Sequence, residues 1–307
     1  MLQVTLNLAL FAMGLFALYK GSDVLVTGTS KTASRLGISS LIISLTIVAY
    51  GTSAPELATS LVATLNSHTG LAVGNIIGSC FANILLVLGI SSVVRPISVS
   101  KSIVRRELPV LLLATSLFSV LAYFNLLNSM GGALLLVSFL LFLSYFIKVA
   151  NVNRKKNDVD FSLHKGFAMI ILGIISVVLG AHMLVHSSVF FARWLGVPEF
   201  IIAISLVAIG TSIPELAVSV TAAWKKEGDI SVGNLLGSNV FNILLIIGLC
   251  SIFSKLPTDS KTINSSFLLV GITILLFPIL YTGRKISRVE GIFLVIIYII
   301  YMWFVFQ

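Results

Sequence analysis

Two stretches of the sequence decide the fold: VAYGTSAPELATS at residues 48–60 and VAIGTSIPELAVS at residues 207–219. A second matching pair follows them, VGNIIGSCFANILLVLG at 73–89 and VGNLLGSNVFNILLIIG at 232–248. Both pairs are separated by an offset of 159 residues, and the gapless alignment around them contains 23 identities in 50 positions. Chance similarity between apolar segments does not match Gly, Thr, Ser, Pro, Glu and Asn in order. The chain therefore contains an internal repeat.

The composition around the repeat is that of a membrane protein. Of the 307 residues, 57% are hydrophobic and 10% are charged, with a mean hydropathy of +1.08. Soluble domains are about 25% charged, so a soluble, disordered or disulfide-stabilised protein is excluded. Cys80 and Cys250 both lie in apolar stretches, which predicts neither a disulfide nor a zinc site. The net charge of +9 comes from Lys and Arg between apolar segments, a distribution that argues against nucleic-acid binding.

The apolar segments predict the number and arrangement of the helices. A helix needs about 20 apolar residues to cross a bilayer. The start of the chain has no basic region or cleavage site and predicts a first helix rather than a signal peptide. Ten segments meet the requirement, at about 3–33, 40–66, 70–93, 103–124, 129–148, 163–193, 199–224, 229–253, 263–281 and 287–306.

The polar stretch at 151–162 divides these segments into a first half at 1–150 and a second half at 163–307. With five spans each, the halves enter the membrane from opposite sides. We therefore predict an all-α integral membrane protein of ten transmembrane helices, built as two inverted five-helix repeats with broken helices at the bilayer midplane.

The loops between these segments predict the orientation. If the N-terminus is outside, sixteen Lys and Arg residues fall in cytoplasmic connections and three in outer ones. Because basic residues favour the cytoplasmic side, both termini are predicted outside the plasma membrane, which is the inner membrane of a bacterial cell.

Of the eleven acidic residues, Glu56 and Glu215 lie deep within apolar spans, and they are partners in the repeat. A charge at the centre of a membrane helix costs about 2.5–3.5 kcal/mol on insertion scales. No Lys or Arg lies at a comparable depth, which leaves a bound cation or a proton to balance these carboxylates. Pro55 and Pro214 precede them and lack the N–H of a helical hydrogen bond, so backbone oxygens are expected to be free nearby.

Further oxygens follow at helical spacing. Thr52 and Ser53 share a helix face with Glu56. The stripe of Asn75, Ser79 and Asn83 is repeated by Asn234, Ser238 and Asn242, although the two residues that open these stripes are interpreted as structural. An all-oxygen set suits Ca²⁺, which takes 6–8 oxygens, and the same oxygens suit Na⁺. Competition of the two ions for one site would couple their transport.

The motif GTSxPE followed by GNxxGSxxxN, present twice in inverted halves, resembles the α-repeats of the sodium/calcium exchanger family within the calcium:cation antiporter superfamily. The sequence has no large regulatory loop between its halves, and in this it is similar to the prokaryotic members of the family. The resemblance implies a non-enzymatic antiporter of Na⁺ and Ca²⁺, usually three Na⁺ per Ca²⁺, in which the first and sixth helices slide to alternate access. It implies no cofactor, and no partner beyond the two ions and the lipid bilayer. The ligands it implies are Ala49, Thr52, Ser53, Glu56, Ser79, Asn83, Ala208, Thr211, Ser212, Glu215, Ser238 and Asn242.

Other readings stay open at this point. Proton coupling is an alternative on the same fold, because glutamates also carry protons. A cation channel fits less well, since channels build their filters on the axis of an oligomer. His182 and His186 are spaced for a metal but are interpreted as ordinary interface residues. The Gly-xxx-Gly pairs at 74/78 and 233/237 predict close helix packing.

Overall fold

The computed structural model describes residues 2–152, 161–196, 210–281 and 283–305. Within these ranges the chain is helical apart from turns and two short strands, β1 (Ile97–Ser98) and β2 (Lys285–Ile286). The strands pair antiparallel, with Ile97 opposite Ile286 and Ser98 opposite Lys285. The predicted all-helical class is therefore confirmed.

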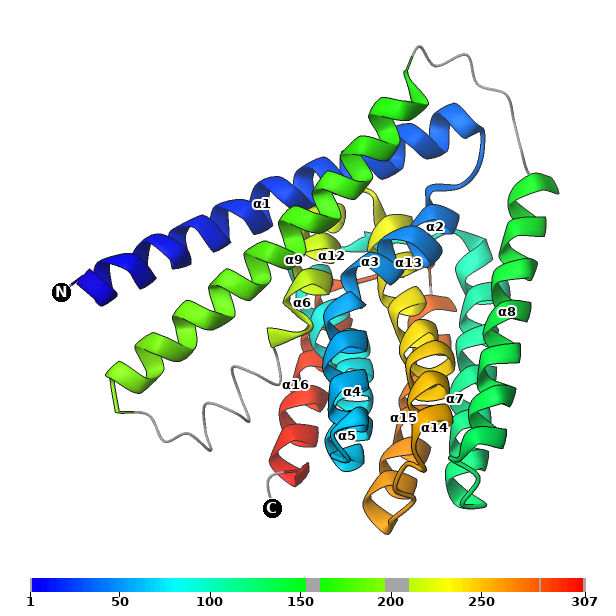
Figure 1. Cartoon of the computed structure of the whole chain (residues 1–307). Coiled ribbons are helices and arrows are strands. Elements are labelled where there is room, and N and C mark those ends of the chain that lie inside the picture. Colours follow the sequence, from blue (N-terminus) through cyan, green and yellow to red (C-terminus); the bar gives the residue numbers. More distant parts are fainter. Residues whose placement is uncertain (1, 153–160, 197–209, 282, 306–307) are drawn as a thin grey trace.

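Two long helices, α1 (Leu2–Leu36) and α9 (Leu163–Trp194), lie side by side and cross the other helices obliquely (Figure 1). Their backbones approach closely at glycines: a Cβ added to Gly180 would lie 2.9 Å from the Gly14 carbonyl oxygen. At the cytoplasmic end of the predicted topology, the Lys225 ammonium lies 2.6 Å from the Asp23 carboxylate and ties α1 to the end of a bundle helix.

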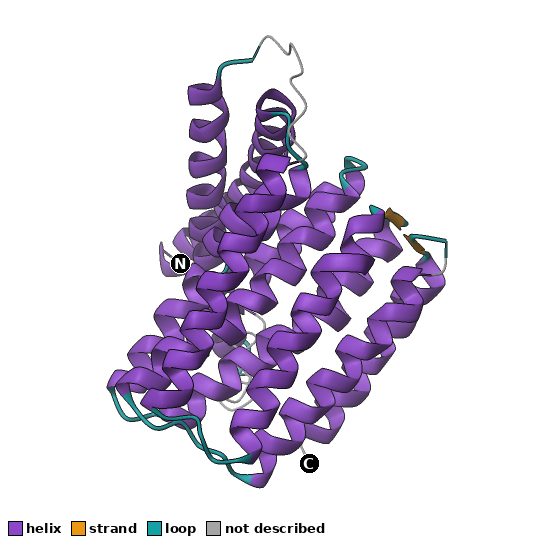
Figure 2. Ribbon diagram, turned by 90° about the vertical axis from the view of Figure 1, so that its right-hand side faces the viewer, coloured by secondary structure: helices purple, strands orange, loops and turns teal. Residues whose placement is uncertain are grey.

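The remaining helices form an upright bundle (Figures 1 and 2). From the first half of the chain come α2 (Ser40–Ile43), η1 (Ser44–Val48), α3 (Ala49–Thr52), α4 (Ala54–Leu65), α5 (Thr69–Phe81), η2 (Ala82–Val87), α6 (Leu88–Val94), η3 (Ile103–Glu107), α7 (Leu108–Tyr123) and α8 (Ser129–Val152). From the second half come α12 (Ile213–Trp224), α13 (Gly228–Val240), η5 (Phe241–Ile246), α14 (Ile247–Phe253), α15 (Ser260–Tyr281) and α16 (Arg288–Val305).

The repeat found in the sequence reappears in the boundaries of the elements. The pairs α4 and α12, α5 and α13, η2 and η5, and α6 and α14 each begin and end at positions 159 residues apart. The shared elements include the π-helical segments η2 and η5, which contain Asn83 and Asn242. Short π-helical segments inside α-helices often lie at functional sites. These four pairs of elements therefore repeat the 159-residue spacing of the sequence motif.

A break interrupts the second predicted span. The helical segments Ser40–Thr52 and Ala54–Leu65 meet at an angle of 46° at Ser53, just before Pro55 in the first turn of α4. Proline is accommodated in a first turn because the N–H it lacks has no helical partner there. The segment that precedes α12 at the equivalent place lies outside the described residues.

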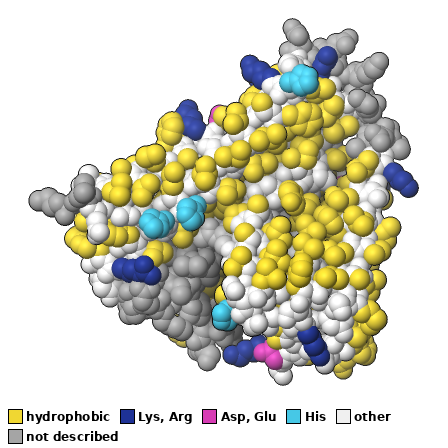
Figure 3. Space-filling model, viewed as in Figure 1, with side chains coloured by type: hydrophobic (Ala, Val, Ile, Leu, Met, Phe, Trp, Pro, Cys, Tyr) yellow, Lys and Arg dark blue, Asp and Glu magenta, His cyan; other side chains and the backbone are white. Residues whose placement is uncertain are grey.

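By length and apolar composition, seven described helices are able to cross a membrane, or eight if the bent pair counts as one span. The predicted ten is not reached by this count. As described, α12 is 12 residues long, too short to span. Hydrophobic side chains cover most of the face seen in Figure 3, and the few Lys and Arg residues lie at its margins. The coarser prediction of a helical membrane protein is confirmed.

The centre of the bundle is α13, in which every residue except Asp229 is buried. Its Gly233 and Gly237 pack against the backbone or side chains of Leu41 and Leu45, as the Gly-xxx-Gly pattern predicts. Gly74 and Gly78 on α5 have no described neighbour within 4 Å of an added Cβ. The residues 159 positions after those that cover α13 fall within 200–208, which lie outside the described residues.

Candidate functional site

Glu56 and Glu215 lie in the first turns of α4 and α12, each directly after a proline. Both side chains are fully buried. The N-terminus of a helix carries a partial positive charge that stabilises a carboxylate in this position. Among the described residues, neither glutamate forms an ion pair with a Lys, Arg or His. The N-termini of α4 and α12 therefore contribute to stabilising these two buried carboxylates.

Hydroxyl groups from both halves of the chain surround the carboxylates. Ser53 of the first half donates to Glu215 Oε1 over 3.0 Å, and Ser238 donates to the same oxygen over 3.3 Å. Ser79 donates to Glu56 Oε1 over 3.2 Å. The site is therefore shared between the repeats, because Glu215 is held by a serine from each of them.

Ser79 joins further groups to this network. Its oxygen accepts hydrogen bonds from the Ser212 hydroxyl over 3.3 Å and from the Asn242 amide over 3.1 Å. Both donors belong to the second half, whereas Ser79 and Glu56 belong to the first. Ser79 thus links the carboxylate of one repeat to the polar side chains of the other.

Thr52 occupies the end of the broken helix and faces α13. Its hydroxyl lies 3.2 Å from Asn234 Oδ1 and 3.3 Å from the Ala49 carbonyl oxygen. The Ala49 carbonyl also accepts the Ser53 N–H over 3.0 Å. This predicted backbone ligand is therefore engaged in hydrogen bonds, and a cation would have to share it with them.

Two polar residues enter the site that the sequence analysis did not assign to it. Asn239 accepts a hydrogen bond from the Asn83 amide over 3.0 Å and donates to the Cys80 carbonyl over 3.3 Å. The second is Asn234, which the sequence analysis interpreted as structural. Its side chain accepts a hydrogen bond from the Thr52 hydroxyl and donates one to the Ser219 hydroxyl. The one available signal for Asn239 was its departure from the repeat, where its partner is Cys80.

Five oxygens at the centre of this arrangement have no hydrogen-bond partner among the described residues. They are Glu56 Oε2, Glu215 Oε2, Asn83 Oδ1, Asn242 Oδ1 and Thr211 Oγ1. Buried polar atoms are almost always paired, so five unpaired oxygens on the predicted site residues need an explanation. Oxygen acceptors of this kind are the ligands of hard cations such as Ca²⁺.

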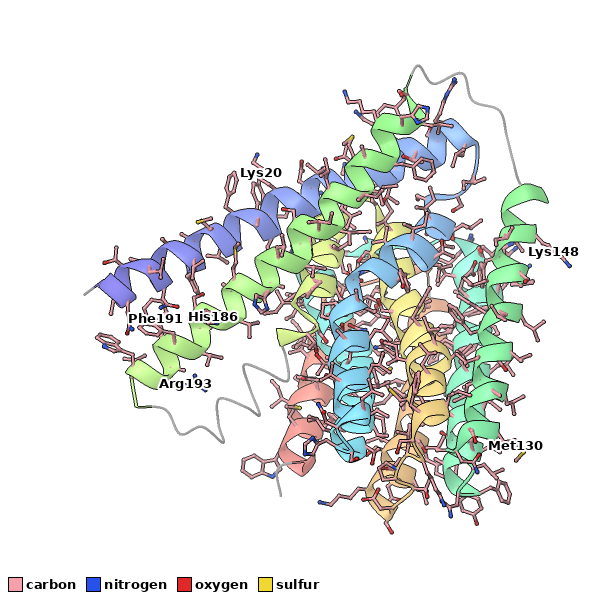
Figure 4. All side chains as sticks on the ribbon, in the orientation of Figure 1. Lys20, Met130, Lys148, His186, Phe191 and Arg193 are labelled. Atoms are coloured by element: carbon pink, nitrogen blue, oxygen red, sulfur yellow. The ribbon has the colours of Figure 1, made fainter. Side chains whose placement is uncertain are left out.

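The structure thus brings together most of the residues predicted for the site. Ser53 and Ser238 donate to Glu215, and Thr52 contacts Ser238 at 3.5 Å. Ser79 joins Glu56, Ser212 and Asn242 into a second hydrogen-bonded group, and Asn83 donates to Asn239. Thr211 is half-buried, and Ala208 lies outside the described residues. His182 and His186 are exposed on α9, with ring centroids 6.5 Å apart, and His186 is labelled there in Figure 4. The described residues contain no group of three or more His, Cys, Asp or Glu side chains placed to hold a metal ion.

Comparison with known proteins decides the family. The family described as "Sodium/calcium exchanger protein" matches residues 6–148 and 165–307, almost the whole chain in two halves. The chain belongs to the sodium/calcium exchanger family. This membership confirms the resemblance of the duplicated motif, and it classifies the protein as a membrane transporter of the antiport type rather than an enzyme.

Relatives of this exchanger-family chain match over nearly its full length. The sodium/calcium exchanger MaX1 of Methanosarcina acetivorans is 33% identical, over 98% of each chain. The inner membrane protein YrbG of Escherichia coli is 32% identical, over 92% of this chain and 91% of its own. A solved structure of the sodium-calcium exchanger NCX_Mj, soaked with Na⁺ and Sr²⁺, matches with a TM-score of 0.86 and 33% identity over 97% of each chain.

Proposed function

We propose that this protein exchanges Na⁺ for Ca²⁺ across the cell membrane by alternating access, and that both ions compete for one site around Glu56 and Glu215. The observation that carries the proposal is the pair of fully buried carboxylates, each with one oxygen unpaired and without a basic partner among the described residues. Burying an ionised carboxylate without a partner costs a large free energy, so both glutamates require a counter-ion. One Ca²⁺ balances both carboxylates, and Na⁺ ions replace it with the same oxygens.

The proposed ligands are the twelve predicted residues. The carboxylates supply the charge, and the hydroxyls of Thr52, Ser53, Thr211, Ser212, Ser79 and Ser238 together with the amide oxygens of Asn83 and Asn242 complete the oxygen set. The backbone oxygens of Ala49 and Ala208 are proposed from the resemblance to the exchanger family. With 6–8 oxygens at about 2.3–2.6 Å for Ca²⁺, this set contains enough oxygens for one Ca²⁺ and for alternative Na⁺ positions.

The architecture proposed for this function is ten transmembrane helices in two inverted repeats, with both termini outside. Four pairs of helical elements begin and end 159 residues apart, which supports the repeat. The break at Ser53 supports a broken helix at the site. Because α1 and α9 pack on each other at glycines and lie across the bundle, we propose that they move together to open the site to either side.

A proton-coupled exchanger is the second candidate, favoured by the same two buried carboxylates. A carboxyl group that has lost its cation takes up a proton instead when the proton is the driving ion. The two functions differ in what drives calcium, which makes them separable by experiment.

The test is uptake of radioactive Ca²⁺ into proteoliposomes loaded with Na⁺, at constant pH. Glu56→Gln and Glu215→Gln remove one charge each, and we expect each to lower uptake by about 100-fold or more, because a buried charge contributes several kcal/mol to binding its counter-ion. The matched control is Glu290→Gln, a first-turn glutamate of α16 that hydrogen bonds to Ser287. It should transport like the wild type.

Each outcome has a definite meaning. Uptake that requires the outward Na⁺ gradient and is lost in both site variants supports the proposal. Uptake that ignores Na⁺ but follows an imposed pH gradient would replace it with proton coupling. Calcium flux that needs no counter-ion at all would rule out antiport.

A further inference from the structure

A cavity lies beside the short strand β2, lined by none of the residues predicted for the ion site. Its volume is about 420 Å³, and its lining residues are Lys101, Val104, Arg105, Tyr281, Gly283 and Arg284. Three of the six are basic and none is acidic. They come from two separate parts of the chain, the segment around η3 that leads into α7 and the end of α15 with the turn that follows it. The fold therefore brings together positive charges that are distant in the sequence.

These charges are not neutralised within the described part of the chain. The ion pairs found there are Arg106 with Glu107 and Lys225 with Asp23, and neither involves a basic residue of the cavity. Lys101, Arg105 and Arg284 are all exposed. Like charges that line one cavity repel one another, and an anion between them removes that repulsion. The cavity thus has the charge pattern of an anion site.

The backbone holds Arg284 at this position. Its φ of +50° is in the left-handed region, which residues other than glycine seldom adopt. The Arg284 carbonyl accepts the Val99 N–H over 2.9 Å, directly beside the β1–β2 ladder. The ladder therefore fixes the turn that carries Arg284 against the connection that carries Lys101 and Arg105. Backbone conformations of this kind concentrate at binding sites.

The depth of the cavity relative to the apolar spans indicates which kind of molecule supplies the anion. It lies at the ends of the apolar spans Ile103–Tyr123 and Ser260–Tyr281, where β1 and β2 lie at one end of the bundle (Figure 2). Lipid headgroups occupy this level. Tyr281 is 75% exposed there, as expected of an aromatic residue at the membrane interface. Val104 and Tyr281 add apolar surface beside the three cations.

We propose that this cavity binds the phosphate group of an anionic phospholipid of the adjoining leaflet. The guanidinium groups of Arg105 and Arg284 match phosphate oxygens as forks of N–H donors, and the Lys101 ammonium adds a point charge. Val104 and Tyr281 contact the glycerol and the first carbons of the lipid. Phosphate is the chemistry recognised, and the apolar side of the cavity favours a lipid over a soluble phosphate. The proposal is independent of which ions the protein exchanges.

The test uses the full-length protein in a neutral detergent and measures bound lipid by native mass spectrometry. The cavity variant is Lys101→Gln with Arg105→Gln and Arg284→Asn; Asn is chosen at 284 because it tolerates left-handed backbone. The matched control removes three exposed basic residues elsewhere on the predicted cytoplasmic side, by Arg35→Gln, Lys148→Gln and Lys165→Gln. Figure 4 shows Lys148 at the end of α8, projecting away from the bundle. Each protein is titrated with phosphatidylglycerol, with phosphatidylcholine and with inorganic phosphate.

We expect wild type and control to bind phosphatidylglycerol with equal affinity, and phosphatidylcholine much more weakly. The cavity variant should bind phosphatidylglycerol at least about tenfold more weakly, since charge-assisted hydrogen bonds to phosphate are lost. Equal binding by the cavity variant and the control would overturn the site. Inorganic phosphate that binds as tightly as the lipid and displaces it would overturn the assignment to lipid. If the triple variant does not fold, Arg105→Gln alone decides, with an expected loss of about threefold or more.

Discussion

Ser79 connects three polar groups of the described site. It donates to Glu56 and accepts from Ser212 and Asn242, so one hydroxyl connects groups of both repeats. A hydrogen bond to a charged group contributes about 1.5–3 kcal/mol, more than one between neutral groups. Loss of this hydroxyl therefore affects a carboxylate and the geometry of two further proposed ligands at once.

We predict that Ser79→Ala raises the Ca²⁺ concentration for half-maximal Na⁺-dependent uptake by about 10–100-fold. The control is Ser60→Ala, which removes a buried hydroxyl on α4 that contacts Asn75 and the Ala72 carbonyl, away from the carboxylates. It should change this concentration by less than about threefold. Equal shifts in the two variants would show that Ser79 acts by packing alone. The measurement is calcium uptake into proteoliposomes over a range of Ca²⁺ concentrations.

Much of the site was predictable at the residue scale, because the repeat marks polar residues that apolar membrane sequence would otherwise exclude. Glu56, Glu215 and their serines follow from that argument, and the structure brings them together. Asn239 was not predictable, since the corresponding residue of the first half is Cys80 and no symmetry points to it. The hydrogen bond from the Ser53 N–H to the Ala49 carbonyl is an ordinary helical bond between residues four apart, so it follows from continuing the helix as far as Ser53.

At the scale of single elements, α15 depends on a cap outside the membrane span. Asp259 precedes the helix and accepts the Thr262 N–H over 3.0 Å. Hydrogen bonds from the Thr262 side chain and backbone hold the pKa of Asp259 below its ordinary value of 3.8. The ionised cap is thus favoured in the folded protein. Its stabilisation is complete above that ordinary value and is lost as the pH falls through the lowered pKa of the folded state.

We predict that Asp259→Ala costs about 1 kcal/mol at neutral pH, as loss of a helix cap does. The melting temperature should fall by about 2 °C. Asp259→Asn, which keeps a capping oxygen, should lose less. In detergent melts from about pH 7 to about pH 3, the difference between wild type and Asp259→Ala should shrink at the acid end. A difference that grows with acid would contradict the assigned direction of the pKa.

The α1–α9 pair makes a separate prediction. A Cβ on Gly180 would lie 2.9 Å from the Gly14 carbonyl, a contact that real Cβ atoms do not show, so Gly180→Ala must push the two helices apart. We expect it to lower the melting temperature by several degrees, corresponding to about 1–3 kcal/mol for overpacking. The matched control is Gly271→Ala on α15, where nothing lies within 4 Å of the added atom. That variant should melt at or above the wild-type temperature.

Sequence patterns predicted the elements better than their internal detail. The apolar segments located nearly all of the helices, and the prolines located the break before α4. The π-helical segments η2 and η5 were not predictable, because one added residue per turn leaves the apolar pattern of a fully buried helix unchanged. The same limit applies to Gly74 and Gly78, whose spacing equals that of Gly233 and Gly237 although their described surroundings differ.

For the whole molecule, the predicted orientation is testable with the chain's own chemistry. Cys80 and Cys250 are both buried, so labelling of the unmodified protein by a membrane-impermeant maleimide should be low. Lys255→Cys and Lys101→Cys place thiols at exposed positions on opposite predicted sides. In intact cells we expect labelling of the cysteine at 255 and at least about tenfold less at 101, with both labelled after the membrane is permeabilised. The reverse pattern would place the termini inside.

The number of spans shows what a sequence conveys about a whole membrane protein and what it does not. Ten apolar segments were predicted from hydropathy, whereas seven or eight described helices meet the length and composition of a span. The shortfall comes from α12, whose preceding residues lie outside the described ranges, and from α16. Hydropathy averages over a window, so it joins the two parts of a broken helix and does not register where the backbone bends.

The absence of a basic partner for Glu56 and Glu215 among the described residues also bears on leakage. An exchanger wastes its gradient whenever it crosses between its two access states with nothing bound. Here such a crossing would expose two uncompensated negative charges to a medium of low dielectric, at a cost that Ca²⁺ or Na⁺ removes. A lysine beside the carboxylates would neutralise the empty site and make the futile crossing easy. On the proposed mechanism, the missing counter-charge would therefore keep the two ion fluxes tied to each other.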